Sequence, residues 1–128
     1  MVVIDYGTSI PASAQKIGAD LATKSAGMLD APLGRTPIHA KGARLNTMAA
    51  GEIETFETVK PVLDVQGDFF FDVGALDAGH TTKLINNVMG MTSACTMSQV
   101  FAVVQKKAVD GQQLCDIMSD RPSNSPFM

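Results

Sequence analysis

Short apolar runs and longer amphipathic stretches alternate along the first two-thirds of the chain. Four short runs with apolar residues predict strands, and they cover residues 2–5, 28–32, 45–49 and 69–73. Apolar residues at helical spacing predict helices over residues 11–24 and 52–63, the second ending or kinking near Pro61. Residues 33–42 are expected to form a loop. The alternation is typical of an α/β fold with a mostly parallel sheet and flanking helices.

The last third of the chain predicts a long C-terminal helix that is apolar on more than one side. No proline interrupts residues 78–108, and a helix of that length would extend about 45 Å. A helix that is apolar on several sides has to be covered on several sides. A last short helix, capped by Asp110, is expected over residues 112–118, and the Ser/Pro/Asn-rich tail is expected to be loose.

The composition indicates a folded domain that binds neither nucleic acid nor a membrane. Of the 128 residues 45% are hydrophobic, and the net charge is −3 with no basic cluster, which argues against both partners. No signal sequence and no membrane-spanning run is expected. Cys95 and Cys115 predict helix packing and no disulfide framework, so the cytoplasm is the expected compartment.

The segment from Gly74 to Asn87 contains the clearest candidate chemistry. Lys83 and Asn87 are four residues apart and share one face of the predicted helix. An apolar surround and the positive end of the helix dipole would disfavour the ammonium form of Lys83, which could then act as a general acid or base. Asn87 could hold a substrate hydroxyl or carbonyl. On spacing alone, a solvated lysine beside polar neighbours is the more common case.

The same segment also has the G-x-x-x-x-G frame of a phosphate-binding loop, from Gly74 to Gly79. His80 stands where that motif needs a lysine, so the phosphates would lack their counter-ion and nucleotide hydrolysis is not expected. His39 and His80 have no cysteine or carboxylate at ligand spacing, so no metal site is expected.

Two loops at strand ends supply further candidates. Gly34-Arg35-Thr36 follows the second strand, and Arg35 could bind a carboxylate, sulfonate or phosphate through its planar fork. Gly7-Thr8-Ser9 follows the first strand, at the end where parallel sheets bind ligands. Plainer explanations are an exposed loop arginine and a helix cap by Ser9.

These motifs occur in the order found in one enzyme family. Residues 5–11, 30–36 and 74–87 are counterparts of D-x-S-T-x-x-P, D-A-P-V-S-G-G and G-x-x-G-x-G-x-x-x-K-x-x-N-N, and residues 45–51 are similar to L-T-I-M-V-G-G. The chain resembles the β-hydroxyacid dehydrogenases. This family includes 3-hydroxyisobutyrate dehydrogenase, tartronate semialdehyde reductase, sulfolactaldehyde reductase and, more remotely, 6-phosphogluconate dehydrogenase.

The resemblance implies both a fold and a reaction. Residues 1–77 would be the second half of a Rossmann-type domain, residues 78–119 the long helix and start of an all-helical dimerisation domain, and residues 120–128 a loose tail. The reaction would be the reversible oxidation of a 3-hydroxy acid by NAD or NADP. The Gly-Arg-Thr loop resembles that of the sulfolactaldehyde reductases, which implies a small acidic substrate held by Arg35.

The resemblance also assigns roles to individual positions. The general acid/base on the substrate hydroxyl would be Lys83, and Asn87 would orient the substrate. The other candidates are Gly34, Arg35, Thr36 and Asn86 for substrate binding, and Thr8 and Gly79 for cofactor binding.

The chain departs from the family pattern at several positions. Gly7 replaces a serine, and Asp77, Ala43 and Ala50 replace glycines. No G-x-G-x-x-G motif and no acidic ribose-binding residue is present. The expected function is therefore a truncated NAD(P)-dependent 3-hydroxyacid dehydrogenase or reductase that is not competent alone.

Two further hypotheses follow from this departure. The chain could be active with a separate cofactor-binding chain, or it could be a non-catalytic, self-associating module that reuses the fold. An unpaired sheet edge and an uncovered helix side predict a homo-oligomer, most simply a symmetric dimer.

Overall fold

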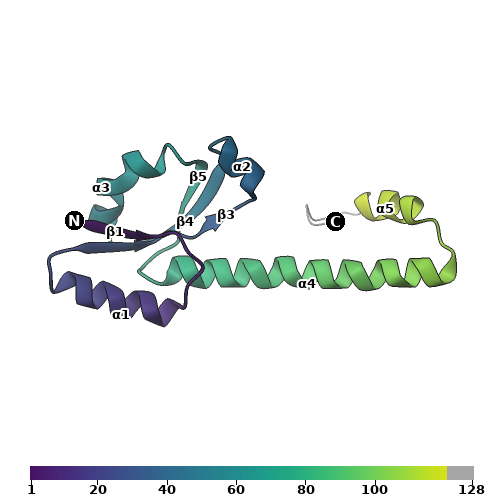
Figure 1. Ribbon diagram of the computed structural model, residues 1–128, viewed down its shortest axis with the longest axis horizontal. Coiled ribbons are helices and arrows are strands. Elements are labelled where there is room, and N and C mark those ends of the chain that lie inside the picture. Colours follow the sequence, from purple (N-terminus) through teal and green to yellow (C-terminus); the bar gives the residue numbers. More distant parts are fainter. Residues whose placement is uncertain (121–128) are drawn as a thin grey trace. The chain divides into compact units, whose positions relative to one another are not determined.

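The computed structural model describes residues 1–120 and divides the chain into two compact units (Figure 1). The first unit spans Met1–Ile85 and contains the sheet, and the second begins at Asn86. The division falls inside the longest helix, whereas the sequence-based boundary lies at the start of that helix. The tail expected to be loose lies outside the described residues, except for Asp120.

The elements follow the predicted alternation closely. The strands are β1 (Val2–Asp5), β2 (Gly27–Asp30), β3 (Leu33–Gly34), β4 (Leu45–Gly51) and β5 (Gly67–Asp72). The helices are α1 (Pro11–Ala22), α2 (Pro37–Lys41), α3 (Ile53–Leu63), α4 (Ala78–Lys107) and α5 (Gly111–Ser119). The region expected to be a loop, residues 33–42, instead contains β3 and α2. Helix α3 contains Pro61 and ends two residues later, at Leu63, close to the predicted end.

The sheet is mixed, although the sequence predicted a mostly parallel one. β1 pairs with β2 and β4 pairs with β5 in parallel, whereas β4 runs antiparallel to β2 and β3. β2 and β3 follow each other along β4. Between them, the carbonyl of Pro32 accepts a hydrogen bond from the N–H of Met48 in β4 (3.1 Å). The connection 35–44 contains only the short helix α2 and is too short for a crossover between parallel strands, so the chain returns antiparallel. The α/β class itself is confirmed.

Two helices cover opposite faces of this sheet (Figure 1). On the α3 face, Leu29, Val59 and Leu63 form the buried core, and they are flanked by Val2, Ile4, Tyr6, Phe56 and Phe70. On the α1 face, Ala14 and Met28 are buried. Each large side chain buried here contributes roughly 1.5–3 kcal/mol to folding. The sheet that carries the carboxyl ends of β1 and β2 is therefore packed on both faces.

The second unit consists of the rest of α4 and α5. Val104 and Met118 are buried in it. Asp110 caps α5 as predicted, because its carboxylate accepts hydrogen bonds from the N–H groups of Gln112 (2.8 Å) and Gln113 (3.1 Å). Among the described helices, none combines the length and apolar character needed to span a membrane.

Candidate active site

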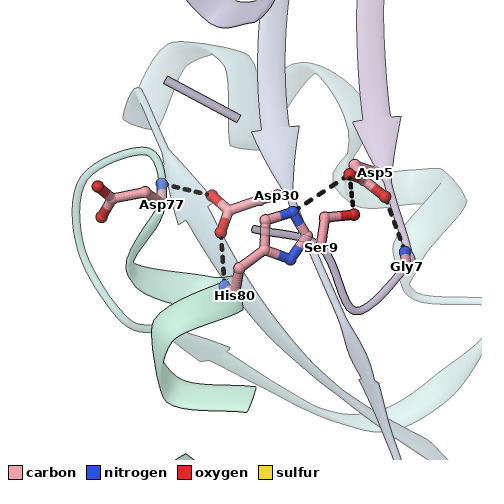
Figure 2. Close-up of polar contacts among 6 residues, drawn as sticks. All are labelled: Asp5, Gly7, Ser9, Asp30, Asp77 and His80. Atoms are coloured by element: carbon pink, nitrogen blue, oxygen red, sulfur yellow. Dashed lines mark hydrogen bonds and ion pairs between the residues drawn. The ribbon is translucent and has the colours of Figure 1, made fainter. Parts of the chain in front are cut away.

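Two carboxylates end neighbouring parallel strands, Asp5 on β1 and Asp30 on β2, and they are paired in register. Asp30 is fully buried, and its oxygens accept hydrogen bonds from the N–H groups of Asp77 (3.0 Å) and His80 (2.7 Å) (Figure 2). The first turn of a helix leaves such N–H groups without intrahelical partners, and a negative charge there is favourable. Asp30 thus caps α4 from another element and holds the first turn of that helix on the sheet.

Gly79, a predicted cofactor-binding residue, lies where α4 touches the sheet. A Cβ atom at this position would come within 2.5 Å of the Met48 carbonyl oxygen and 2.7 Å of Asp30 Oδ2. Both distances are far below van der Waals contact, so no larger residue fits without movement. The close approach of helix and strand accounts for a glycine at this position.

Asp77 occupies a position where the family pattern has glycine. Its φ of 94° lies in the left-handed region, which costs a non-glycine residue about 1–3 kcal/mol. Its N–H is bonded to Asp30, and its carboxylate accepts a short hydrogen bond from the Gln15 side-chain amide. These two contacts offset part of the backbone strain.

His80 links α4 to the turn after β1. Its ring is fully buried, and Nε2 lies 3.2 Å from Asp5 Oδ2 (Figure 2). Asp5 also accepts hydrogen bonds from the N–H of Gly7 (2.8 Å) and the hydroxyl of Ser9 (2.9 Å). Partial burial raises the pKa of Asp5, but the hydrogen bonds from Gly7 and Ser9 and the nearby His80 hold that pKa below its ordinary value.

The alternative role of Ser9 as a helix cap is wrong. Helix α1 has Ile10 at its N-cap position and no side-chain cap hydrogen bond. The Ser9 hydroxyl donates to Asp5 instead, so it stabilises the turn and not the helix.

The frame from Gly74 to Gly79 does not form a phosphate cradle. The N–H groups of Asp77 and His80 are already bonded to a carboxylate, and Gly79 is buried against the sheet. An anion could bind there only by displacing Asp30.

Lys83 and Thr8 are the candidates left available for a ligand in the first unit. Lys83 is half-buried, three residues after His80, and its side chain forms no hydrogen bond or ion pair with another described residue. Thr8 is exposed in the turn bonded to Asp5 and likewise has no partner among residues 1–120. Asn86 and Asn87 are exposed and are the first two residues of the second unit.

The Gly34–Thr36 loop is already engaged within the chain. Arg35 Nη1 donates to the Arg44 carbonyl and to Asp68 Oδ2 (3.2 Å), and its guanidinium lies 5.2 Å from the centre of the Phe69 ring. The Thr36 hydroxyl is 2.8 Å from His39 Nδ1. Among the described residues, none of these contacts joins the loop to Asp5, Asp30 or His80. A ligand at Arg35 would therefore compete with Asp68.

Sequence reasoning missed the roles of Asp5, Asp30 and His80. The signal was present, since each aspartate directly ends an apolar strand, and parallel neighbours bring such ends together. The spacing of residue 80 could not reveal its contact with residue 5, because that contact depends on the packing of α4.

Comparisons with known proteins identify relatives of the chain. Residues 1–74 match the family model described as the NAD binding domain of 6-phosphogluconate dehydrogenase. The chain is 36% identical over 90 residues to 3-sulfolactaldehyde reductase of Escherichia coli (strain K12), covering 70% of this chain and 30% of the relative. It is 30% identical over 118 residues to 3-hydroxyisobutyrate dehydrogenase of Pseudomonas aeruginosa, covering 91% and 39%.

Solved structures show the same likeness. The 3-hydroxyisobutyrate dehydrogenase of Salmonella typhimurium aligns with a TM-score of 0.86 at 25% identity, over 98% of this chain and 45% of that one. The chain thus spans less than half the length of these relatives. Since the family model covers more than half of the 128 residues, the chain belongs to the β-hydroxyacid dehydrogenase family of NAD(P)-binding oxidoreductases.

Proposed function

We propose that this chain supplies the substrate-side part of an NAD(P)-dependent 3-hydroxyacid dehydrogenase or reductase, with Lys83 as the general acid/base. The observation that supports this most is the half-buried Lys83, whose side chain has no partner among residues 1–120, near the beginning of a helix that Asp30 caps at the carboxyl ends of β1 and β2. A lysine held there can exchange a proton with a substrate hydroxyl.

The other candidates take supporting roles in this proposal. Thr8 would contact the nicotinamide, and Asn87 and Asn86, which follow Lys83 in the sequence, would orient the substrate. The nicotinamide, when bound, exchanges a hydride with the substrate carbon. Gly79 contributes indirectly, because its lack of a side chain lets α4 approach the sheet.

The described residues fit one end of a dinucleotide better than the other. Exposed Thr8, whose N–H, carbonyl and hydroxyl groups have no partner among the described residues, suits the polar nicotinamide head. The N–H groups that begin α4 suit a pyrophosphate but are occupied by Asp30. We therefore propose that the phosphates and adenosine are held by residues outside this chain or on a partner chain.

The proposed substrate is a small 3-hydroxy acid, or the matching semialdehyde, with a second acidic group. Arg35 is the residue for that group, because a guanidinium binds carboxylate and sulfonate through paired hydrogen bonds. The 36% identical relative is a 3-sulfolactaldehyde reductase. An acidic substrate would take the place of Asp68 on Arg35, with Gly34 and Thr36 shaping the loop.

Fluorescence titration with NADH and NADPH tests the cofactor part of the proposal. We expect no saturable binding to the chain alone. We expect binding and 3-hydroxyacid oxidation after fusion to the glycine-rich half of the P. aeruginosa relative. In that fusion, Lys83→Met should lower kcat by about 10²–10⁴, and Lys107→Met, a matched change at the other end of α4, should not. A fusion that binds cofactor but keeps its kcat without Lys83 contradicts the proposal.

A second candidate function is self-association without catalysis. It is favoured by exposed apolar side chains in the second unit, which include Val88, Met89, Met91 and Ile117, each more than 60% exposed. Such surfaces are usually covered, and a second copy, most simply in a two-fold dimer, would cover them. Sedimentation velocity at micromolar concentration tests this, and a monomer there excludes it.

A further inference from the structure

His80 stands between two parts of the first unit that carry different site candidates. Its backbone N–H is bonded to Asp30, and its ring Nε2 lies 3.2 Å from Asp5 Oδ2. Asp5 in turn accepts hydrogen bonds from Gly7 and Ser9, the residues on either side of Thr8. One buried ring therefore connects the first turn of α4 with the turn after β1 (Figure 2).

The contact with Asp5 is the only polar contact of the His80 ring among the described residues. Nδ1 is buried and has no hydrogen-bond partner there. An ionised carboxylate can only accept hydrogen bonds, so Nε2 is the donor in the contact with Asp5. Loss of the contact would leave a second buried ring nitrogen unpaired, which is unfavourable. The ring is thus held to one partner.

We propose that His80 is a positioning residue, which fixes the Gly7–Ser9 turn, and Thr8 within it, against the helix that carries Lys83. Lys83 follows His80 by three residues, so the two side chains share one side of α4. Of the described side chains in α4, only His80 bonds to Asp5. The consequence for catalysis rests on the proposed function, since Thr8 and Lys83 would hold nicotinamide and substrate next to each other.

Hydrogen exchange measured by NMR tests the positioning without any ligand. In His80→Leu, which keeps much of the volume but has no donor, the Gly7 amide should exchange about tenfold faster than in wild type. His80→Gln should restore slow exchange, because its side-chain amide can donate to Asp5. His39→Gln is the control and should leave Gly7 unchanged. Equal Gly7 exchange in wild type and His80→Leu overturns the proposal.

A second measurement needs no variant and covers the case in which His80→Leu does not fold. Long-range ¹H–¹⁵N spectra of the wild-type chain should show a proton on His80 Nε2. A ring protonated on Nδ1 alone could not donate to Asp5 and would also overturn the proposal.

A nicotinamide titration in the fusion protein separates this inference from the proposed function. If the wild-type fusion binds NADH, His80→Leu should weaken binding several-fold and His80→Gln should recover it. If the wild-type fusion binds no nicotinamide, the proposed function fails, and the exchange of Gly7 still decides the role of His80.

Discussion

The two strand-end regions of the first unit are built in opposite ways. Around Asp30 and His80, a fully buried carboxylate accepts hydrogen bonds from two backbone N–H groups. Around Arg35, partly exposed side chains pair with each other, with 29% of Arg35 and 42% of Asp68 accessible. A buried contact to the backbone fixes position, whereas an exposed ion pair can exchange partners at little cost. The first region therefore suits the reacting groups, and the second suits recognition of an acidic substrate.

The largest expected effect comes from removing the cap of α4. Asp30→Ala leaves the N–H groups of Asp77 and His80 buried without an acceptor, so we expect the free energy of unfolding to fall by about 2–4 kcal/mol. Urea denaturation followed by circular dichroism measures this. Asp20→Ala, an exposed aspartate in α1, is the control and should change stability little. A loss below about 0.5 kcal/mol for Asp30→Ala would mean that water replaces the cap.

A smaller loss is expected where α4 meets the sheet. Gly79→Ala places a methyl group within 2.5 Å of the Met48 carbonyl oxygen, and overpacking of this kind costs about 1–3 kcal/mol. Gly111→Ala is the matched control, because its methyl would meet only Val104 and Phe101 at 3.8 Å or more. Equal stability of the two variants would show that the helix start is loosely packed.

A gain in stability is expected beside the Arg35 region, at the end of α2. Ala43 has a φ of 50°, and the next N–H, from Arg44, is bonded to the His39 carbonyl (2.9 Å), which is the pattern of a helix end that favours glycine. Ala43→Gly should raise the free energy of unfolding by about 0.5–1 kcal/mol. Ala40→Gly, inside α2, should lower it. A loss at both positions would contradict the left-handed backbone.

The ion pair in the Arg35 region should matter little for stability. Asp68→Asn is expected to change the free energy of unfolding by less than about 1 kcal/mol, because the pair is partly exposed and screened. In the fusion protein the same change should lower KM for acidic substrates, since Arg35 is released from its competitor. An unchanged KM would indicate that Arg35 does not meet the acidic group of the substrate.

The smallest expected effect concerns pH. Because the folded chain holds the pKa of Asp5 below its ordinary value of 3.8, the stability that Asp5 contributes is fully present above that pH. It is lost as the pH falls through the lower pKa of the folded state. The stability difference between wild type and Asp5→Asn should therefore narrow between pH 5 and strong acid. A difference that stays constant would show that ionised Asp5 contributes nothing.

The elements were predictable from sequence because their signals are local. Apolar runs located β1, β2, β4 and β5, and helical spacing located α1, α3 and α4 to within two residues. The prediction of a loop over residues 33–42 was wrong at β3, because this strand has only two residues and forms by pairing with β4 rather than through its own propensity.

The candidate site was predictable only in part. Lys83 and Arg35 stand in recognisable motifs, and their roles remain predictions. The network of Asp5, Asp30 and His80 was not foreseen, since its contacts join residues 47 to 75 positions apart. The direction of β4 was missed for the same reason, because register and pairing partner depend on tertiary packing.

The cap supplied by Asp30 also has a consequence for the order of folding. Helix α4 contains 30 residues, but the acceptor for its first N–H groups comes from a position 47 to 50 residues earlier. Helix nucleation is the costly step of helix formation, and here the first turn gains its acceptor only when β2 is in place. The beginning of α4 should therefore form together with the sheet, and a peptide starting at residue 78 should fray at its amino end.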